Sequence, residues 1–144
     1  MEVPANFSGG CACGSIRYHC SAAPLAMINC HCRDCQRAGG SAYSPTVVIY
    51  SANFVLLRGE PRYHEVAADS GSIARRGFCE KCGSPLFAST SARPYVMSVR
   101  AGSLDDPKWF RAARDYWTRS AQPWDLLSPD TVKIGDGSMR NPGA

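Results

Sequence analysis

Long apolar runs are missing from this 144-residue sequence. Its longest examples, such as Phe54-Val55-Leu56-Leu57, are far shorter than the roughly 20 residues that a membrane-spanning helix needs. The first ten residues also lack the basic end and the apolar stretch of a secretory signal peptide. We therefore expect a soluble, cytoplasmic protein without a membrane partner.

Runs of positive charge are missing as well. Lysine and arginine supply 16 residues against 12 aspartates and glutamates, but they are scattered, and Arg75-Arg76 is their only adjacent pair. A nucleic-acid surface would need a basic patch, commonly interleaved with aromatic residues. We therefore expect no nucleic-acid partner, and the sequence leaves the oligomeric state unknown.

Low-complexity tracts, internal repeats and a convincing amphipathic helix are also absent. Instead, short alternating or β-branched stretches lie between frequent turns, which is typical of all-β domains. The pattern predicts short antiparallel strands over residues 15–20, 25–29, 42–50, 54–57, 62–66, 73–78, 86–88 and 95–99.

The remaining segments are predicted to be less regular. We expect residues 1–10 to be a loosely held arm and residues 36–41 to be a loop or one helical turn. At this length the chain is expected to form a single domain over residues 1–144. Its core should run from about residue 8 to about residue 127, with a loose tail over residues 135–144.

Cysteine, by contrast, is plentiful, and its spacing carries most of the functional information. Seven of the eight cysteines fall into three tight groups: Cys11 with Cys13, Cys30 with Cys32 and Cys35, and Cys79 with Cys82. Disulfide frameworks spread their cysteines between elements, and the cytosol keeps thiols reduced. Bunched cysteines therefore predict metal binding. Cys20, which alternates with Ile16 and Tyr18, is instead expected to be a buried thiol.

The first and third groups together predict a closed site. Cys11, Cys13, Cys79 and Cys82 each lie on a turn that carries a glycine, and four thiolates complete a tetrahedral zinc site. Such a site is structural. It would tie the N-terminal strand to the turn near residue 80.

The middle group predicts a second site that has three ligands. Cys30, Cys32 and Cys35 bind soft metals, zinc first, with copper(I) or an iron–sulfur cluster left open. A zinc ion held by three thiolates is a poor generator of hydroxide but is well suited to a thiol as fourth ligand. His31 is expected to hydrogen-bond a cysteine sulfur or the substrate rather than to ligate the metal.

These motifs resemble those of a known family. The resemblance rests on residues 10–18, 30–35 and 78–84, and it continues in residues 102–107 and 120–124. Over about residues 8–127 the sequence resembles the glutathione-dependent formaldehyde-activating enzyme family, which also includes centromere protein V. One departure is Asp115, at a position where members often carry histidine.

The resemblance implies a β-tent fold with two zinc ions per chain. It assigns Cys11, Cys13, Cys79 and Cys82 to the structural zinc, and Cys30, Cys32 and Cys35 to the catalytic zinc. It also implies a reaction, the addition of glutathione to formaldehyde to give S-hydroxymethylglutathione.

The residues and the resemblance together lead to one preferred function and two alternatives. We expect a zinc-dependent carbon–sulfur lyase or synthase that presents glutathione or a similar thiol to formaldehyde or a related electrophile. Arg33, Arg37 and Arg100 are candidates to hold the substrate carboxylates, and Gly40 and Ser41 could line the pocket.

The first alternative is a non-catalytic zinc module that binds a protein partner. It would need Trp109, Trp117 and Trp124 in an exposed patch, whereas aromatic residues more often pack in the core. The second alternative is redox sensing by Cys30 and Cys32.

Overall fold

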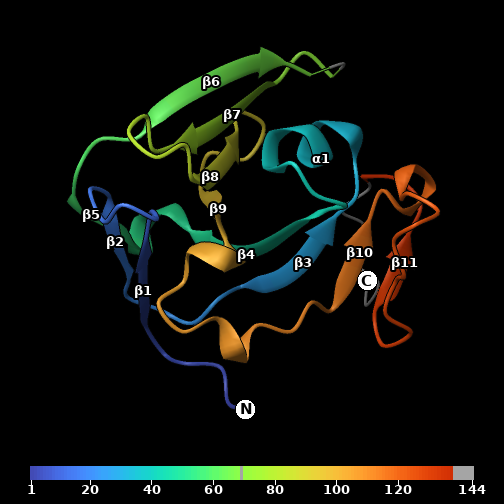
Figure 1. The fold of residues 1–144 in the computed structure, drawn as a ribbon, viewed down its shortest axis with the longest axis horizontal. Helices are drawn as coiled ribbons and strands as arrows, with labels where there is room; N and C mark the ends of the chain where they lie inside the picture. Colours follow the sequence, from blue (N-terminus) through green and yellow to red (C-terminus); the bar gives the residue numbers. More distant parts are fainter. Residues whose placement is uncertain (69, 138–144) are drawn as a thin grey trace.

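The computed structural model describes residues 1–68 and 70–137 and shows two β-sheets that lean against each other (Figure 1). The smaller sheet has three antiparallel strands in the order β1-β2-β5: β1 (Phe7–Gly10), β2 (Arg17–Cys20) and β5 (Phe54–Arg58). The all-β class predicted from the sequence is confirmed.

The larger sheet has eight strands in the order β11-β10-β3-β4-β9-β8-β7-β6. In chain order these are β3 (Ala26–Cys30), β4 (Ser44–Tyr50), β6 (Arg62–Ala67), β7 (Ile73–Phe78), β8 (Pro85–Thr90), β9 (Val96–Arg100), β10 (Arg114–Tyr116) and β11 (Val132–Ile134). The pairs β3–β10 and β10–β11 are parallel, and the others are antiparallel.

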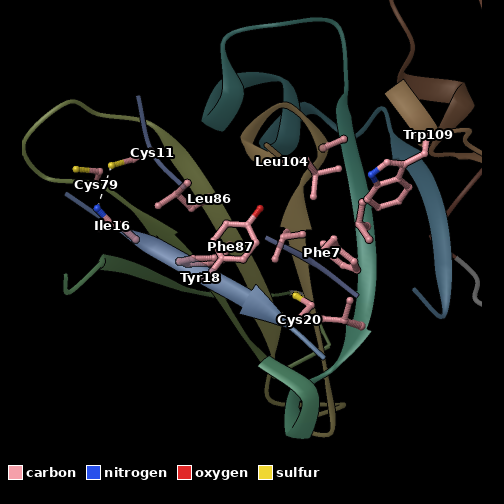
Figure 2. Packing of buried hydrophobic residues seen from close by; sticks show 14 residues of the cluster. Phe7, Cys11, Ile16, Tyr18, Cys20, Cys79, Leu86, Phe87, Leu104 and Trp109 are labelled. Carbon is pink, nitrogen blue, oxygen red and sulfur yellow. Dashed lines mark hydrogen bonds between the residues drawn. The ribbon is translucent and has the colours of Figure 1, made fainter. Parts of the chain in front are cut away.

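The core lies between the sheets and follows the predicted alternation (Figure 2). Ile16, Tyr18 and Cys20 are all buried. The Tyr18 ring packs edge-on against Phe87, with ring centroids 5.4 Å apart. These contacts explain why β2 keeps one register, because a shift of one residue would turn its apolar side chains to the solvent.

The local structure differs from the predictions in three places. Residues 7–10 are not part of a loose arm but form β1, because Phe7 is buried against Trp109 with ring centroids 5.2 Å apart. The sequence also did not indicate β10 and β11, each only three residues long. Such short strands carry too little alternation to be recognised.

The third difference concerns the segment after the middle cysteines, where the expected helical turn belongs to a seven-residue helix, α1 (Arg33–Gly39), that begins earlier in the chain. The Cys32 Sγ accepts a hydrogen bond from the Cys35 backbone N–H at 3.3 Å, so a cysteine serves as the N-cap. Gly40 closes the helix in the left-handed conformation, with a φ of 69°. Four short 3₁₀ turns, Ser51–Asn53, Ala101–Ser103, Pro107–Trp109 and Thr118–Ser120, join other strands.

The chain beyond β11 was expected to be a loose tail. Part of it contacts the sheet end: the Trp117 backbone N–H donates to the Asp136 carbonyl at 3.2 Å, and Arg119 Nε donates to the Gly135 carbonyl at 3.1 Å. Residues 138–144 lie outside the described residues. No helix in the described part of the chain is long and apolar enough to cross a membrane.

Candidate metal centres

Two matching turns build the first cysteine cluster. The Gly14 N–H donates to the Cys11 carbonyl at 3.1 Å, and the Gly83 N–H donates to the Cys79 carbonyl at 2.7 Å. Both glycines have a φ of 78°, a conformation that L side chains rarely adopt. Each turn therefore reverses the chain directly after its second cysteine, which turns two sulfurs to the same side.

The sulfur positions of this cluster fit a tetrahedral zinc ion. The Cys13 Sγ lies 3.6 Å from the Cys11 Sγ and 3.8 Å from the Cys79 Sγ. Zinc–sulfur bonds of about 2.3 Å at a tetrahedral centre place sulfurs about 3.8 Å apart. Cys82 completes the cluster, in which all four sulfurs lie within 4.8 Å of one another. The structure thus brings together the four predicted ligands from two distant parts of the chain.

Hydrogen bonds favour ionisation of two of these four sulfurs. The Ser84 hydroxyl and backbone lower the pKa of Cys82 to about 5. Burial opposes ionisation of Cys11, but hydrogen bonds from the Ile16 N–H and the Ser15 hydroxyl outweigh it and lower its pKa to about 7. Cys13 differs: Ser15 favours its ionisation, but burial and its contacts with Cys11 and Cys82 raise its pKa. At Cys11 and Cys82 a metal ion that binds thiolates has little proton affinity to overcome.

The second cluster forms where β3 runs into α1. Cys30 ends β3, Cys32 caps α1 and Cys35 lies in its first turn. Their three sulfurs lie within 4.8 Å of one another and could hold a metal ion. The local chain geometry alone gathers them, whereas the first cluster depends on the tertiary fold.

The charge around these three thiols favours one thiolate. Hydrogen bonds from Cys30 and Cys32 lower the pKa of Cys35 to about 2 against its burial, and the positive charge of Arg100 and a hydrogen bond from Arg76 act in the same direction. Cys30 takes the opposite role: its contacts with the other two sulfurs and its burial raise its pKa. The cluster thus keeps negative charge on sulfur, and two arginines supply the opposite charge.

His31 does not take part in the cluster. Its side chain is buried, its Nε2 donates to Asp115 Oδ1 at 2.7 Å, and its Nδ1 lies 3.4 Å from Asp125 Oδ2. The second contact lacks hydrogen-bond geometry, and neither of its two atoms has a hydrogen-bond partner among the described residues. The predicted hydrogen bond from His31 to a cysteine sulfur is therefore wrong, since both ring nitrogens face carboxylates, whereas a contact with the substrate stays a prediction.

Asp115 explains where the ring of His31 points. Besides His31, its carboxylate accepts hydrogen bonds from Asn29 Nδ2 at 3.0 Å and from the Thr131 hydroxyl. Burial opposes its ionisation, but these three hydrogen bonds outweigh burial and hold the pKa of Asp115 below its ordinary value. Asp115, which stands where family members often carry histidine, thus holds the side chain of His31, the residue between Cys30 and Cys32.

Gln36 fixes the loop from a second direction. Its Nε2 donates to the His31 carbonyl at 2.6 Å and to the Ser120 carbonyl at 3.0 Å, while its Oε1 accepts from Gln122 Nε2 at 3.0 Å. The cysteine loop is therefore held by α1 and by the segment after β10. Sequence analysis did not single out Gln36, because an isolated glutamine carries no pattern.

Two cavities adjoin this region and share Arg100. One, of about 400 Å³, is lined by Ala38 of α1 and by Arg76. The other, of about 530 Å³, is lined by Ser41 and Tyr43. Of the three predicted carboxylate-binding arginines, Arg100 lines both cavities, whereas Arg33 and Arg37 are exposed on α1. Of the two residues expected to line the pocket, Ser41 lines the second cavity and Gly40 lines neither.

Arg76 was missed, although a signal existed. Alternation along β7 puts adjacent residues on opposite faces, so the pair Arg75-Arg76 had to send one guanidinium inwards. Arg75 lies over the Tyr63 ring at 3.6 Å from its centroid, and Arg76 Nη2 donates to the Cys35 Sγ at 3.9 Å.

The three tryptophans do not form one patch. Trp109 is buried in the core, Trp117 is half-buried and Trp124 is 69% exposed. Core packing, the preferred interpretation, therefore holds for Trp109 and fails for Trp124.

Comparisons with known proteins agree with this geometry. The family model for "Glutathione-dependent formaldehyde-activating enzyme" matches residues 6–120. A crystal structure of a Rhodobacter sphaeroides protein has a similar fold, with a TM-score of 0.57 and 19% sequence identity over 70% of this chain and 92% of that chain. No curated protein matches the chain significantly. Both cysteine clusters lie within the matched range, and the chain belongs to the glutathione-dependent formaldehyde-activating enzyme family.

Proposed function

We propose that the chain is a zinc-dependent carbon–sulfur lyase or synthase that joins glutathione, or a similar thiol, to formaldehyde or a related electrophile. The observation that carries this proposal is the cluster of three cysteine sulfurs, with His31 turned away from it and two arginines beside it. The family match supports the thiol and the aldehyde.

The two clusters would hold two zinc ions of different roles. Cys11, Cys13, Cys79 and Cys82 provide four sulfurs and would close their site, so its role would be structural. Cys30, Cys32 and Cys35 provide three, and a zinc ion there supplies a position at which a substrate thiol is held as thiolate.

The charge of the second site favours an anionic substrate sulfur. Three thiolates and a divalent ion sum to about −1, and Arg76 and Arg100 bring the total to about +1. One further thiolate would neutralise it. A neutral ligand such as water would leave the buried positive charge of the arginines uncompensated.

The proposed reaction is the addition of a thiolate to the carbonyl group of formaldehyde. The thiolate sulfur of the substrate forms a bond with the carbonyl carbon of formaldehyde, and the electron pair of the carbon–oxygen π bond moves to oxygen. That oxygen then takes a proton equivalent to the one that the thiol lost, which gives S-hydroxymethylglutathione. The chain's residues bind and orient the thiol, because the addition itself needs no oxidant or reductant.

The non-catalytic alternative has one observation in its favour, the exposure of Trp124. The cavity lined by Arg76, whose Nη2 also contacts the Cys35 sulfur, favours the enzyme instead, because a partner-binding surface needs no such hollow.

Cobalt-substituted protein tests the proposal directly. We expect glutathione to increase the sulfur-to-cobalt charge-transfer band in a saturable way, and Cys32→Ser to abolish the increase while leaving the four-cysteine site loaded. Formation of the hydroxymethyl adduct, followed by NMR in the zinc protein, should exceed the uncatalysed rate and fall to that rate in Cys32→Ser. An unchanged cobalt spectrum, or full turnover by Cys32→Ser, would overturn the proposed function.

A further inference from the structure

Arg100 is a buried cation whose Nε has no acceptor among the described residues. Its side chain ends β9 and is only 9% exposed, and its Nε has no hydrogen-bond partner among residues 1–68 and 70–137. A guanidinium has five N–H donors, and burying them without acceptors is costly. A side chain in this state needs an anion or another acceptor.

Arg76 adds a second guanidinium to the same place. It lies on β7, its Nε also has no partner in the described part of the chain, and its Nη2 reaches only the Cys35 sulfur at a long 3.9 Å. Both arginines line the cavity of about 400 Å³ next to α1. Two cations on neighbouring walls would repel each other unless an anion lay between or beside them.

We propose that Arg76 and Arg100 bind a carboxylate of the thiol substrate, in the cavity between α1 and the strands β7 and β9. This inference rests on the proposed function, because it takes the substrate sulfur to lie at the neighbouring three-cysteine site. Guanidinium groups match carboxylates with two parallel hydrogen bonds, a geometry that a sulfur ligand does not provide.

The size and continuity of the cavities fit a peptide-like thiol. Arg100 and Pro85 line both cavities, so the two adjoin at these residues. Their volumes, about 400 and 530 Å³, fall in the range of small-molecule sites, about 300–1,000 Å³. The second cavity offers the hydroxyl-bearing residues Ser41 and Ser103 to the rest of such a ligand.

A simpler role for the two arginines is to balance the charge of the three thiolates. That role explains their effect on Cys35 but leaves the Nε–H donor of each arginine without an acceptor, and sulfur is a weak acceptor. Charge balance alone predicts that a thiol binds equally well with or without carboxylates. The two roles therefore differ in a measurable quantity.

The test compares glutathione with glutathione diethyl ester, which keeps the thiol but masks both carboxylates. Each is titrated into the cobalt-substituted protein, and the charge-transfer band reports the dissociation constant. We expect the wild-type protein to bind glutathione about tenfold more tightly or better, the size expected for a charged hydrogen-bonded pair. Arg100→Met should remove this preference, so that acid and ester bind equally, although the loss of its positive charge weakens the binding of both thiols.

Arg37→Met is the matched control, because Arg37 is exposed on α1 and lines neither cavity. It should keep the preference for free carboxylates. Arg76→Met should reduce the preference and gives a second test if Arg100→Met fails to fold. Equal affinities for acid and ester in the wild-type protein, or an undiminished preference in a folded Arg100→Met variant, would overturn the carboxylate site while leaving the proposed function intact.

A second measurement separates failure of this inference from failure of the proposed function. S-methylglutathione has both carboxylates but cannot bind through a thiolate, and calorimetry on the zinc-loaded protein measures its affinity. Binding that Arg100→Met weakens would support the carboxylate site even if no thiol changed the cobalt spectrum. No binding, or displacement by an equal concentration of inorganic phosphate, would overturn the assignment to a carboxylate.

Discussion

Asp115 shows at the scale of one residue how a buried charge is held. Its side chain is 2% exposed, and Asn29, His31 and Thr131 donate to its two oxygens. Lys133 Nζ lies 3.7 Å away and adds a positive charge. A carboxylate with this many donors stays ionised in the interior, and the donors in turn depend on it.

We predict that Asp115→Asn destabilises the protein by about 2–4 kcal/mol. The NH2 group of the introduced asparagine would face hydrogen-bond donors, and His31 would lose its carboxylate partner. Chemical denaturation measures the change. Asp130→Asn is the control, since Asp130 is exposed, and it should alter stability by no more than about 0.5 kcal/mol. Equal effects of the two substitutions would contradict the role given to Asp115.

Gly9 is needed for a different reason, the closeness of its neighbours. A Cβ at this position would lie 2.3 Å from the Tyr18 hydroxyl oxygen and 2.4 Å from the Ser103 carbonyl oxygen. That hydroxyl is hydrogen-bonded to Ser103 Oγ at 2.6 Å, so Tyr18 cannot move without a loss.

Gly9→Ala is therefore expected to cost at least about 2 kcal/mol, at the upper part of the range for overpacking. Gly102→Ala is the matched control, because a Cβ there meets nothing within 4 Å and the backbone is not left-handed. It should change stability by less than about 1 kcal/mol. Thermal unfolding of the two variants under the same conditions measures the difference, and a Gly9→Ala variant as stable as Gly102→Ala would contradict the close packing.

At the scale of elements, the sequence predicted those strands and sites that are determined by residues close to one another in the chain. Strand β7 begins and ends where the pattern placed it, at Ile73 and Phe78, because its flanking turns are marked in the sequence. The six residues Cys30–Cys35 show their candidate metal site directly in the sequence, since one loop gathers three sulfurs.

Elements whose stability comes from distant partners could not be predicted in the same way. Strand β10 has only three residues, and its place is set by parallel pairing with β3 on one side and β11 on the other. Likewise, the approach of Arg76 to Cys35 joins residues from two separate elements. Neither contact leaves a periodic pattern, because each depends on how the sheet brings its strands together.

The two cysteine turns lead to a prediction at this scale. Residues 14–78 lie between Cys13 and Cys79, so a metal ion that joins these turns closes a long loop. Loop closure of this length is worth about 4 kcal/mol in the chain-entropy model. We expect Cys79→Ala to lose one of two bound metal ions and about that much stability, as measured by metal analysis and denaturation.

Cys20→Ala provides the comparison for that experiment. Cys20 is fully buried, and its burial raises the pKa of its thiol to about 12, but it belongs to neither cluster. Its replacement should keep both metal ions and cost only about 1–2 kcal/mol from the cavity it leaves. Retention of two ions by Cys79→Ala would show that the four cysteines do not form one site.

At the scale of the whole molecule, the ionised carboxylates make stability depend on pH. Arg17 donates to Asp105 and lowers the pKa of the Asp105 carboxyl. The hydrogen-bond donors around Asp115 likewise lower the pKa of the Asp115 carboxyl against its burial. A carboxyl with a lower pKa in the folded state stabilises the protein above its unfolded pKa of about 3.9. This stabilisation is lost as the pH falls through the folded pKa. The Arg17–Asp105 pair is partly exposed and contributes little, so Asp115 should dominate.

We therefore predict that the free energy of unfolding falls between about pH 5 and pH 3, and falls less steeply in Asp115→Asn. Acid also protonates the metal-binding cysteines, but both proteins carry the same two clusters, so the difference between their curves isolates Asp115. Denaturant unfolding at each pH, with the bound metal measured in parallel, gives the two curves. They should converge as the wild-type carboxylate becomes protonated, because the charge that distinguishes the proteins is then gone. Curves that stay parallel down to pH 3 would mean that Asp115 has the same pKa in the folded and unfolded chains, and that its buried hydrogen bonds do not favour the ionised form.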